Sequence, residues 1–175
     1  MNDEARTHHE TAVSLQPLVA LVRAVDRVSA AVTIAAMAGM AGLVAAQVFY
    51  RYVLSSSIDS ADELSRLFFV WSIFLALPHG IRYGVHVGID LLPMALSTRI
   101  QDILFRAMNL ITIVLMAVVA FVTYRVIVDK WSELMPTLPL TASLYYVPVL
   151  IASIHAALHL ILLVWNGQRL WDDTL

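Results

Sequence analysis

The chain has 175 residues, of which 60% are hydrophobic and only 14% are charged, and its mean hydropathy is +0.79. A soluble domain usually carries about 25% charged residues, so the composition indicates an integral membrane protein. The net charge of −2 and the lack of a basic tail give no indication of nucleic acid as a partner, and the absence of cysteine excludes disulfides and thiol chemistry.

The first uncharged run predicts a membrane-spanning helix over residues 28–50. The run VSAAVTIAAMAGMAGLVAAQVFY lies between Arg27 and Arg51, and about 20 residues suffice to cross the hydrocarbon of a bilayer. Residues 1–16 are polar and are expected to form a tail, outside a single membrane domain of residues 17–175. Between residue 17 and Arg27, one helix face is apolar and another carries Arg23, Asp26 and Arg27, which is typical of an interfacial lead-in.

Small residues recur every four positions on two adjacent faces of this first span. Such stripes allow the backbones of two helices to approach closely in lipid. The pattern fits either a contact with another subunit or packing within the chain itself. The residues concerned are Ala31, Ala35, Gly39, Ala38, Gly42 and Ala46.

A second span is predicted over residues 60–82, with charges in its first turns. Only 15 uncharged residues lie between Arg66 and Arg82, so a spanning helix must begin near Ser60 and include Asp62 and Glu63. Acid before base at helical spacing favours pairing along the helix. Alternatively these charges face another protein, with Arg51 as a further partner across a short loop.

The end of the second span carries two interleaved patterns in LPHGIRYGVHVGID, residues 77–90. Three glycines recur every four positions, and Arg82, His86 and Asp90 recur at the same interval, offset by two. If the segment is helical, its polar side chains form a ladder opposite bare backbone. Because each glycine disfavours a helix by about 1 kcal/mol, a flexible loop is the alternative.

The connection that follows is predicted to contain an amphipathic interfacial segment between the second and third helices. Ser97 is a plausible N-cap, and Ile100, Ile103 and Leu104 share one face, opposite charged residues. The third span is expected over residues 104–128. Arginine and lysine near the helix ends number seven on the side of the N-terminus and four on the other side. This imbalance predicts that both termini are cytoplasmic.

The fourth span is predicted over residues 139–166 and contains His155 and His159, four residues apart. That spacing suits a metal or haem pair, but no neighbouring carboxylate or cysteine in the sequence accompanies it, and a polar helix contact is more common. No nucleophile with its base and no phosphate-binding loop is present. We therefore expect no catalytic residue, no metal and no cofactor. The predicted fold class is an all-α integral membrane protein with four transmembrane helices.

Residues 51–92 resemble the signature region of the small membrane subunit of TRAP transporters, the DctQ-type family. The similar elements are Arg51-Tyr52, Glu63-Leu64-Ser65-Arg66, Phe69-Val70-Trp71, Phe74-Leu75, Arg82, His86 and Asp90, and the segment MPTLPLTASLYYVPV resembles the family's approach to its fourth helix. Two positions depart from the family pattern, since a tryptophan is common where Ser60 stands and a glycine where Ala76 stands.

The resemblance implies a small scaffold subunit of a sodium-coupled transporter in the bacterial inner membrane. Its partners would be a large multi-span subunit, a periplasmic binding protein that delivers an organic acid such as a C4-dicarboxylate, and membrane lipid. Arg51, Asp62, Glu63 and Arg66 would orient the second helix at the outer boundary, and Trp71 would pack at lipid depth. Arg82, His86 and Asp90 would organise its cytoplasmic end against the partner.

Two other functions remain open at this point. Four helices with His79, His155 and His159 also suit a haem b-binding anchor of a redox enzyme. A small membrane scaffold with no role in transport is the third possibility. Co-purification with a large multi-span protein would separate these classes.

Overall fold

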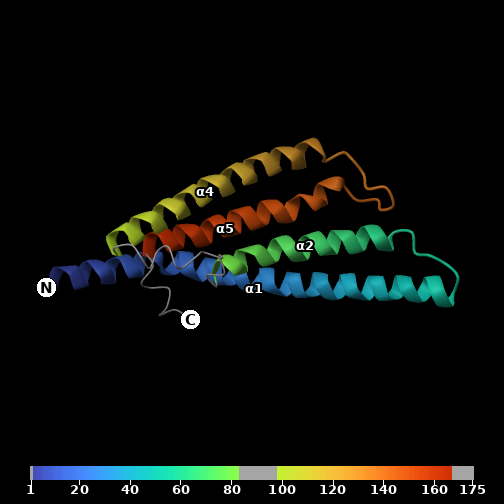
Figure 1. Ribbon diagram of the computed structural model, residues 1–175, viewed down its shortest axis with the longest axis horizontal. Helices are drawn as coiled ribbons and strands as arrows, with labels where there is room; N and C mark the ends of the chain where they lie inside the picture. Colours follow the sequence, from blue (N-terminus) through green and yellow to red (C-terminus); the bar gives the residue numbers. More distant parts are fainter. Residues whose placement is uncertain (1, 83–97, 167–175) are drawn as a thin grey trace.

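The computed structural model describes residues 2–82 and 98–166 (Figure 1). It contains four long helices, α1 (Asn2–Val53), α2 (Ala61–Arg82), α4 (Thr98–Asp129) and α5 (Val147–Asn166), and a short 3-10 helix, η1 (Ala142–Tyr145). Within these ranges the only strand-like pairing is a single bridge between Leu134 and Thr141. The all-helical prediction is confirmed for the described residues.

The four long helices lie side by side in the order α1, α2, α5, α4 (Figure 1). α1 packs mainly on α2, α2 also packs on α5, and α4 packs on α5 at the far edge. Along the helix axes, the row has two ends. The start of α1 and the end of α5 lie at one of them, and the α1–α2 loop and the α4–α5 connection lie at the other, which we call the loop end (Figure 1). This is an open row rather than a closed four-helix bundle, so each helix keeps a face that no other described helix covers.

α1 is continuous from Asn2 to Val53 and buries one narrow stripe. Val22, Asp26, Ser29 and Ala36 are buried at spacings of four, three and seven residues, and most of their neighbours are exposed. The polar residues predicted to form a separate tail are part of the same helix. The boundary of the membrane domain at residue 17 therefore coincides with no break in α1, and it stays a prediction.

Contacts between α1 and α2 use one glycine and one buried serine. A Cβ atom added at Gly39 would lie 2.9 Å from the ring of Phe68, so glycine allows the two helices to approach there. The Ser29 hydroxyl donates to the carbonyl oxygen of Leu75 at 2.8 Å. At Gly42 no atom lies within 4 Å of an added Cβ, so only part of the small-residue pattern is used inside the chain.

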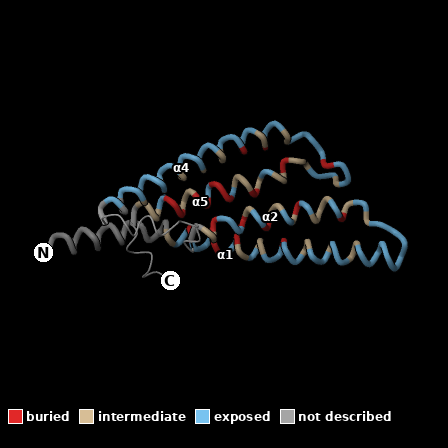
Figure 2. Tube along the Cα trace, in the orientation of Figure 1, coloured by how far each residue is buried: buried red, intermediate tan, exposed pale blue. Residues whose placement is uncertain are grey.

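α4 and α5 pack through a small apolar core. Ala156 and Leu160 of α5 are buried, and Ile113 and Met116 of α4 pack against them. Most of α4 is nevertheless exposed, as Figure 2 shows along its outer side. The exposed side chains are apolar, with Ile111 and Phe121 more than 60% accessible. Lipid is the natural cover for a helix that is hydrophobic on its exposed side.

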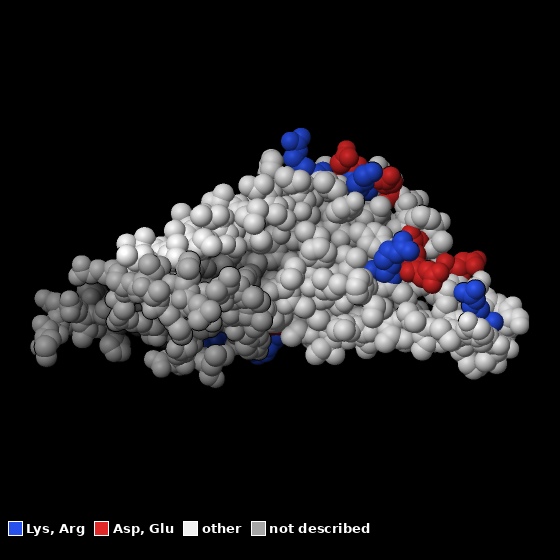
Figure 3. All heavy atoms as spheres, viewed as in Figure 1, with Lys and Arg blue, Asp and Glu red and all other residues white. Residues whose placement is uncertain are grey.

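Three helical segments are long and apolar enough to cross a membrane: Val19–Val53, Ile103–Asp129 and Ala142–Val164. They contain the first and third predicted spans and most of the fourth, so three of the four predicted spans are candidates by length and composition. The 22 residues of α2 have the required length, but the helix carries Asp62, Glu63, Arg66 and Arg82 and is not among them. Figure 3 shows a broad uncharged middle, with acidic and basic side chains gathered at the end with the α1–α2 loop and the α4–α5 connection.

The predicted interfacial segment begins at its N-cap Ser97, which lies outside the described residues, and continues through Ile100, Ile103 and Leu104. The part that is described, from Thr98, is helical and continues without a break into the third span. Ile100 and Ile103 are exposed on this first part of α4. A separate interfacial helix thus stays a prediction.

Candidate functional site

The carboxylate of Glu63, near the start of α2, forms hydrogen bonds with the connection between α4 and α5. One carboxylate oxygen accepts hydrogen bonds from the backbone N–H of Thr137, at 2.8 Å, and from its hydroxyl. The hydroxyl of Tyr145 donates to the backbone carbonyl of Glu63 at 3.2 Å. One residue of α2 therefore contacts two positions on the segment that leads into α5.

The other charged residues at this end lie on the surface. The amide of Gln47 donates to Asp62 at 3.0 Å and joins α1 to α2. Arg51 and Arg66 are exposed, and no ion pair between either arginine and an acid of α2 is present among the described residues. Asp62 and Glu63 thus accept hydrogen bonds from neutral partners, Gln47 and Thr137, where the sequence suggested ion pairs. The roles of the two acids and the two arginines at a subunit interface stay predictions.

Trp71 lies half-buried between α2 and α5. Its indole N–H donates to the carbonyl oxygen of Leu144 in η1 at 3.0 Å. The carbonyl at a short 3-10 turn is a natural acceptor, because the end of such a turn has unpaired backbone oxygens. Trp71 therefore packs within the chain through its ring and anchors η1 through its N–H.

The α4–α5 connection is folded by its own hydrogen bonds. The N–H of Met135 donates to Leu140 at 2.8 Å, the N–H of Ala142 donates to Glu133 at 2.8 Å, and the Ser143 hydroxyl donates to Ile127 at 2.8 Å. Exposed Lys130 and Glu133 form an ion pair at 2.6 Å. The Glu133 carboxylate raises the pKa of Lys130 above its ordinary value of 10.5. These bonds give the segment a fixed shape that presents Thr137 to Glu63.

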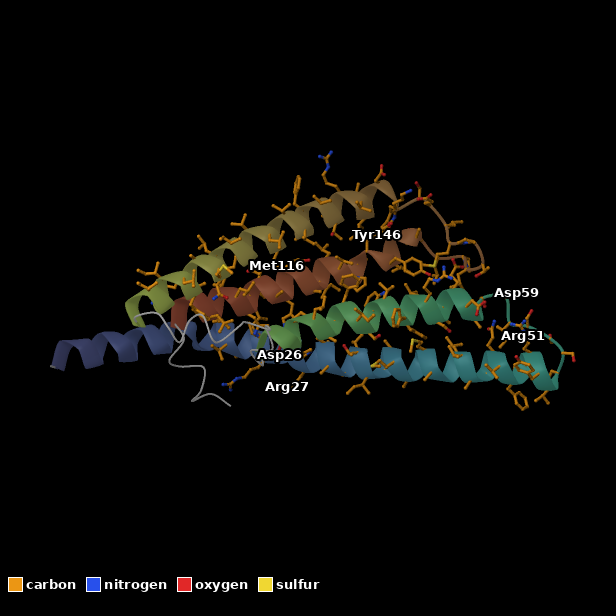
Figure 4. The ribbon with its side chains drawn as sticks, in the orientation of Figure 1. Asp26, Arg27, Arg51, Asp59, Met116 and Tyr146 are labelled. Atoms are coloured by element: carbon orange, nitrogen blue, oxygen red, sulfur yellow. The ribbon has the colours of Figure 1, made fainter. Side chains whose placement is uncertain are left out.

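Toward the opposite end of the row, midway along α1 and near the middle of α5, three buried side chains converge. The Nε2 atoms of His155 and His159 lie 2.9 Å and 2.8 Å from Oδ1 of Asp26, and 3.2 Å from each other. All three residues are at most 5% exposed. Arg27, the next residue after Asp26, points away from the helices (Figure 4). The cluster could hold a metal ion through one atom of each residue.

The geometry does not resemble the axial ligation of a haem. The ligands of a haem iron approach from opposite faces of the porphyrin. His155 and His159 instead lie on one face of one helix, and both are turned toward Asp26. The ring of His79 lies edge-on, with its centroid 6.0 Å from that of His155.

The sequence interpretation noted the histidine pair but missed its carboxylate. Asp26 was assigned to a charged face with Arg23 and Arg27, although it lies on the face of α1 that turns inward. The signal was present, because Val22, Asp26, Ser29 and Ala36 follow one helical stripe. What the sequence alone does not give is the pairing of that stripe with α5.

The remaining predicted site residues are Arg82, His86 and Asp90. Arg82 is the last residue of α2, and its side chain is outside the described part. His86 and Asp90 fall within residues 83–97 and are also outside it. The prediction that these three residues face the partner subunit is therefore not tested.

The apolar helices and their exposed faces define a multi-pass membrane protein. The family described as "Tripartite ATP-independent periplasmic transporters, DctQ component" matches residues 40–170, well over half of the chain. The chain belongs to this family and is a small-subunit component of a TRAP transporter. A Haemophilus influenzae protein is 22% identical over 134 residues, covering 77% of this chain and 81% of that protein, and is provisionally named a TRAP transporter small permease protein.

Proposed function

We propose that the chain is the scaffold subunit of a sodium-coupled TRAP transporter that imports an organic acid across the bacterial inner membrane. Its partners are a large multi-span subunit that binds sodium and substrate, and a periplasmic protein that delivers the substrate. In this arrangement α2 is a fourth span and both termini are cytoplasmic. The family and the three apolar helices support the proposal.

The observation that carries a scaffold role is the open row of helices. α4 and the outward side of α1 expose continuous apolar surface, including Ile34, Val48, Phe121 and Val122. Large apolar side chains on such a surface suit contact with lipid. A part with small side chains suits contact with another membrane subunit, because helices in lipid pack closely where the side chains at the contact are small. α1 has these in Ala31, Ala35 and Gly42, which are exposed. We therefore assign the outward face of α1 to the large subunit.

The distribution of polar groups supports a subunit that does not itself bind the substrate. Sites for ions and substrates in secondary transporters use interrupted helices near the middle of the membrane. In the described residues α1, α4 and α5 are each continuous. The polar contacts of Glu63 and Asp62 lie at the helix ends and hold the helices to one another. Sodium coupling and substrate choice are accordingly assigned to the large subunit and the binding protein.

The test is reconstitution of the three components in vesicles with an imposed sodium gradient. We compare Glu63→Lys with Glu133→Lys, which reverses another exposed acid at the same end. Glu63→Lys should lower both the yield of the complex and the uptake of substrate, because it removes the acceptor for Thr137 and repels Arg66. Glu133→Lys should leave both near the wild-type level. Unchanged yield and uptake in Glu63→Lys would contradict the role assigned to the start of α2.

The proposed topology has its own test. The chain has no cysteine, so a single Ser56→Cys substitution places a unique thiol in the α1–α2 loop. An impermeant maleimide added to intact spheroplasts should label it, since the loop faces the periplasm in the proposed orientation. Labelling only after the membrane is opened would reverse the assigned orientation.

A further inference from the structure

The buried cluster of Asp26, His155 and His159 joins two helices that otherwise make few contacts. Asp26 lies on α1 and the histidines lie one turn apart on α5. α1 and α5 are at neighbouring positions only near this end of the row, since α2 lies between them over most of their length (Figure 1). The cluster is thus the main polar connection between the first and the last helix of the chain.

With Asp26 ionised, protons alone leave one edge of this triangle unfavourable. Each neutral imidazole nitrogen is either a donor or an acceptor. If both Nε2 atoms carry hydrogens, both N–H groups donate to the same Asp26 oxygen and crowd each other, because the two nitrogens are only 3.2 Å apart. If one Nε2 accepts from the other, its lone pair faces the carboxylate oxygen of Asp26 at less than 3 Å. The site is too buried for bulk water to relieve this edge.

A cation at the centre of the same three atoms satisfies all of them at once. Tetrahedral zinc has ligands at about 2.0–2.1 Å, which places neighbouring ligand atoms about 3.3 Å apart. The observed separations of 2.8–3.2 Å reach that spacing if each atom moves outward by a few tenths of an ångström. Two imidazoles and one carboxylate on a helix pair form a donor set typical of zinc, and it leaves one open position.

We propose that Asp26, His155 and His159 bind one divalent transition-metal cation of the zinc type, which cross-links α1 to α5. The sequence alone predicts no metal, because it does not show that Asp26 faces the histidines. The site is independent of transport chemistry, and its effect is structural: it fixes the first part of the span in α1 to the middle of α5. Metal binding then stabilises the folded subunit, because the unfolded chain does not hold the three ligands together.

The experiment uses the full untagged chain, purified in detergent after treatment with a chelator and loaded with zinc or with cobalt(II). Metal content is measured by mass spectrometry, affinity by competition with a chelating dye, and geometry by the visible spectrum of the cobalt form. Asp26→Ala and His155→Ala remove one ligand each. Ser29→Ala is the matched control, because it removes a buried contact one turn from Asp26 and keeps all three ligands.

The N-terminal pair His8 and His9 provides the control for adventitious binding. We expect one equivalent of zinc in the wild type, in Ser29→Ala and in the double variant His8→Ala/His9→Ala. Asp26→Ala and His155→Ala should bind zinc at least ~100-fold more weakly. The proposal is overturned if the equivalent disappears with His8 and His9, or if either ligand variant retains wild-type affinity.

A conservative replacement keeps the test valid if the alanine variants do not fold. His159→Cys supplies a thiolate at the same position, and it is the sole thiol of the chain. The folded variant loaded with cobalt(II) should acquire the thiolate-to-metal charge-transfer absorption that the wild type lacks. Folded His159→Cys protein without that absorption would contradict the assignment of His159 as a ligand.

Discussion

The two ends of the helix row use similar polar groups in opposite surroundings. At the loop end, Glu63 and Asp62 accept hydrogen bonds at the protein surface, where water competes for every donor. At the other end, Asp26 meets two imidazoles in a site that is almost fully buried. A partner removed at the surface is replaced by water, whereas a partner removed from the buried end leaves an uncompensated polar group.

The two groups of contacts therefore have different effects on the fold. The loop-end contacts set which segments meet, because Glu63 contacts both Thr137 and, through its backbone, Tyr145. The buried cluster determines how firmly the first and last helices are held. We expect substitutions to have effects that follow burial rather than the number of contacts.

The largest effect is expected from Asp26→Ala. It leaves His155 and His159 facing each other without their shared carboxylate, and breaking a buried pair of this kind costs about 3 kcal/mol or more. Unfolding in mixed detergent micelles measures the loss of stability. Ser29→Ala, which removes one buried hydrogen bond between helices, should lose only about 0.6 kcal/mol. Equal losses in the two variants would remove the distinction between the cluster and an ordinary polar contact.

A pair of glycine substitutions tests the contact between α1 and α2. Gly39→Ala places a methyl group 2.9 Å from the ring of Phe68, so the ring or the helix must shift, at a loss of about 1–3 kcal/mol. Gly42→Ala has open space, and helix propensity favours alanine by about 1 kcal/mol. Thermal unfolding of the isolated subunit should therefore move in opposite directions. A common direction would show that α1 and α2 do not approach at Gly39.

Gly42→Ala also sharpens the proposed interface. In the isolated subunit it is neutral or stabilising, but it would lower the yield of the complex if this face of α1 packs closely on the large subunit. Unchanged yield would place the large subunit on another face.

Trp71 is half-buried, so Trp71→Phe tests a contact between the exposed and the fully buried extremes. The ring remains, but the hydrogen bond from the indole N–H to Leu144 is lost, and we expect a loss of about 1 kcal/mol. Hydrogen exchange at the backbone of η1 should rise at the same time, because the bond anchors that turn. A stability loss without faster exchange in η1 would assign Trp71 a packing role alone.

The sequence predicted the elements of this fold well because lipid imposes a strong length requirement. Uncharged runs of about 20 residues identify spans by themselves, and α1, α4 and α5 follow them. The start of α2 was also predictable, because 15 uncharged residues are too few to span and the helix had to include Glu63.

The site was harder to predict, because it depends on which faces meet. Glu63 was singled out for its charge, but its actual partner is Thr137, 74 residues away in the chain. Asp26 and His155 are 129 residues apart. Spacing along one helix gives a face, whereas the identity of the opposing face comes only from the packing of whole helices.

The smallest effect is expected from Glu133→Gln, which breaks the exposed ion pair with Lys130 at 2.6 Å. Because Glu133 raises the pKa of Lys130, the contribution of the pair is fully present below the ordinary pKa of 10.5 and is lost only as the pH rises through the higher value. From pH 7 to 9 the pair is therefore formed in the wild type, but water screens it, so its removal should leave the unfolding temperature unchanged within error. Asp26→Asn, which keeps the shape of the side chain and removes its charge, should lower the unfolding temperature throughout that range. A Glu133→Gln loss as large as that of Asp26→Asn would mean that burial does not govern the difference between the two ends.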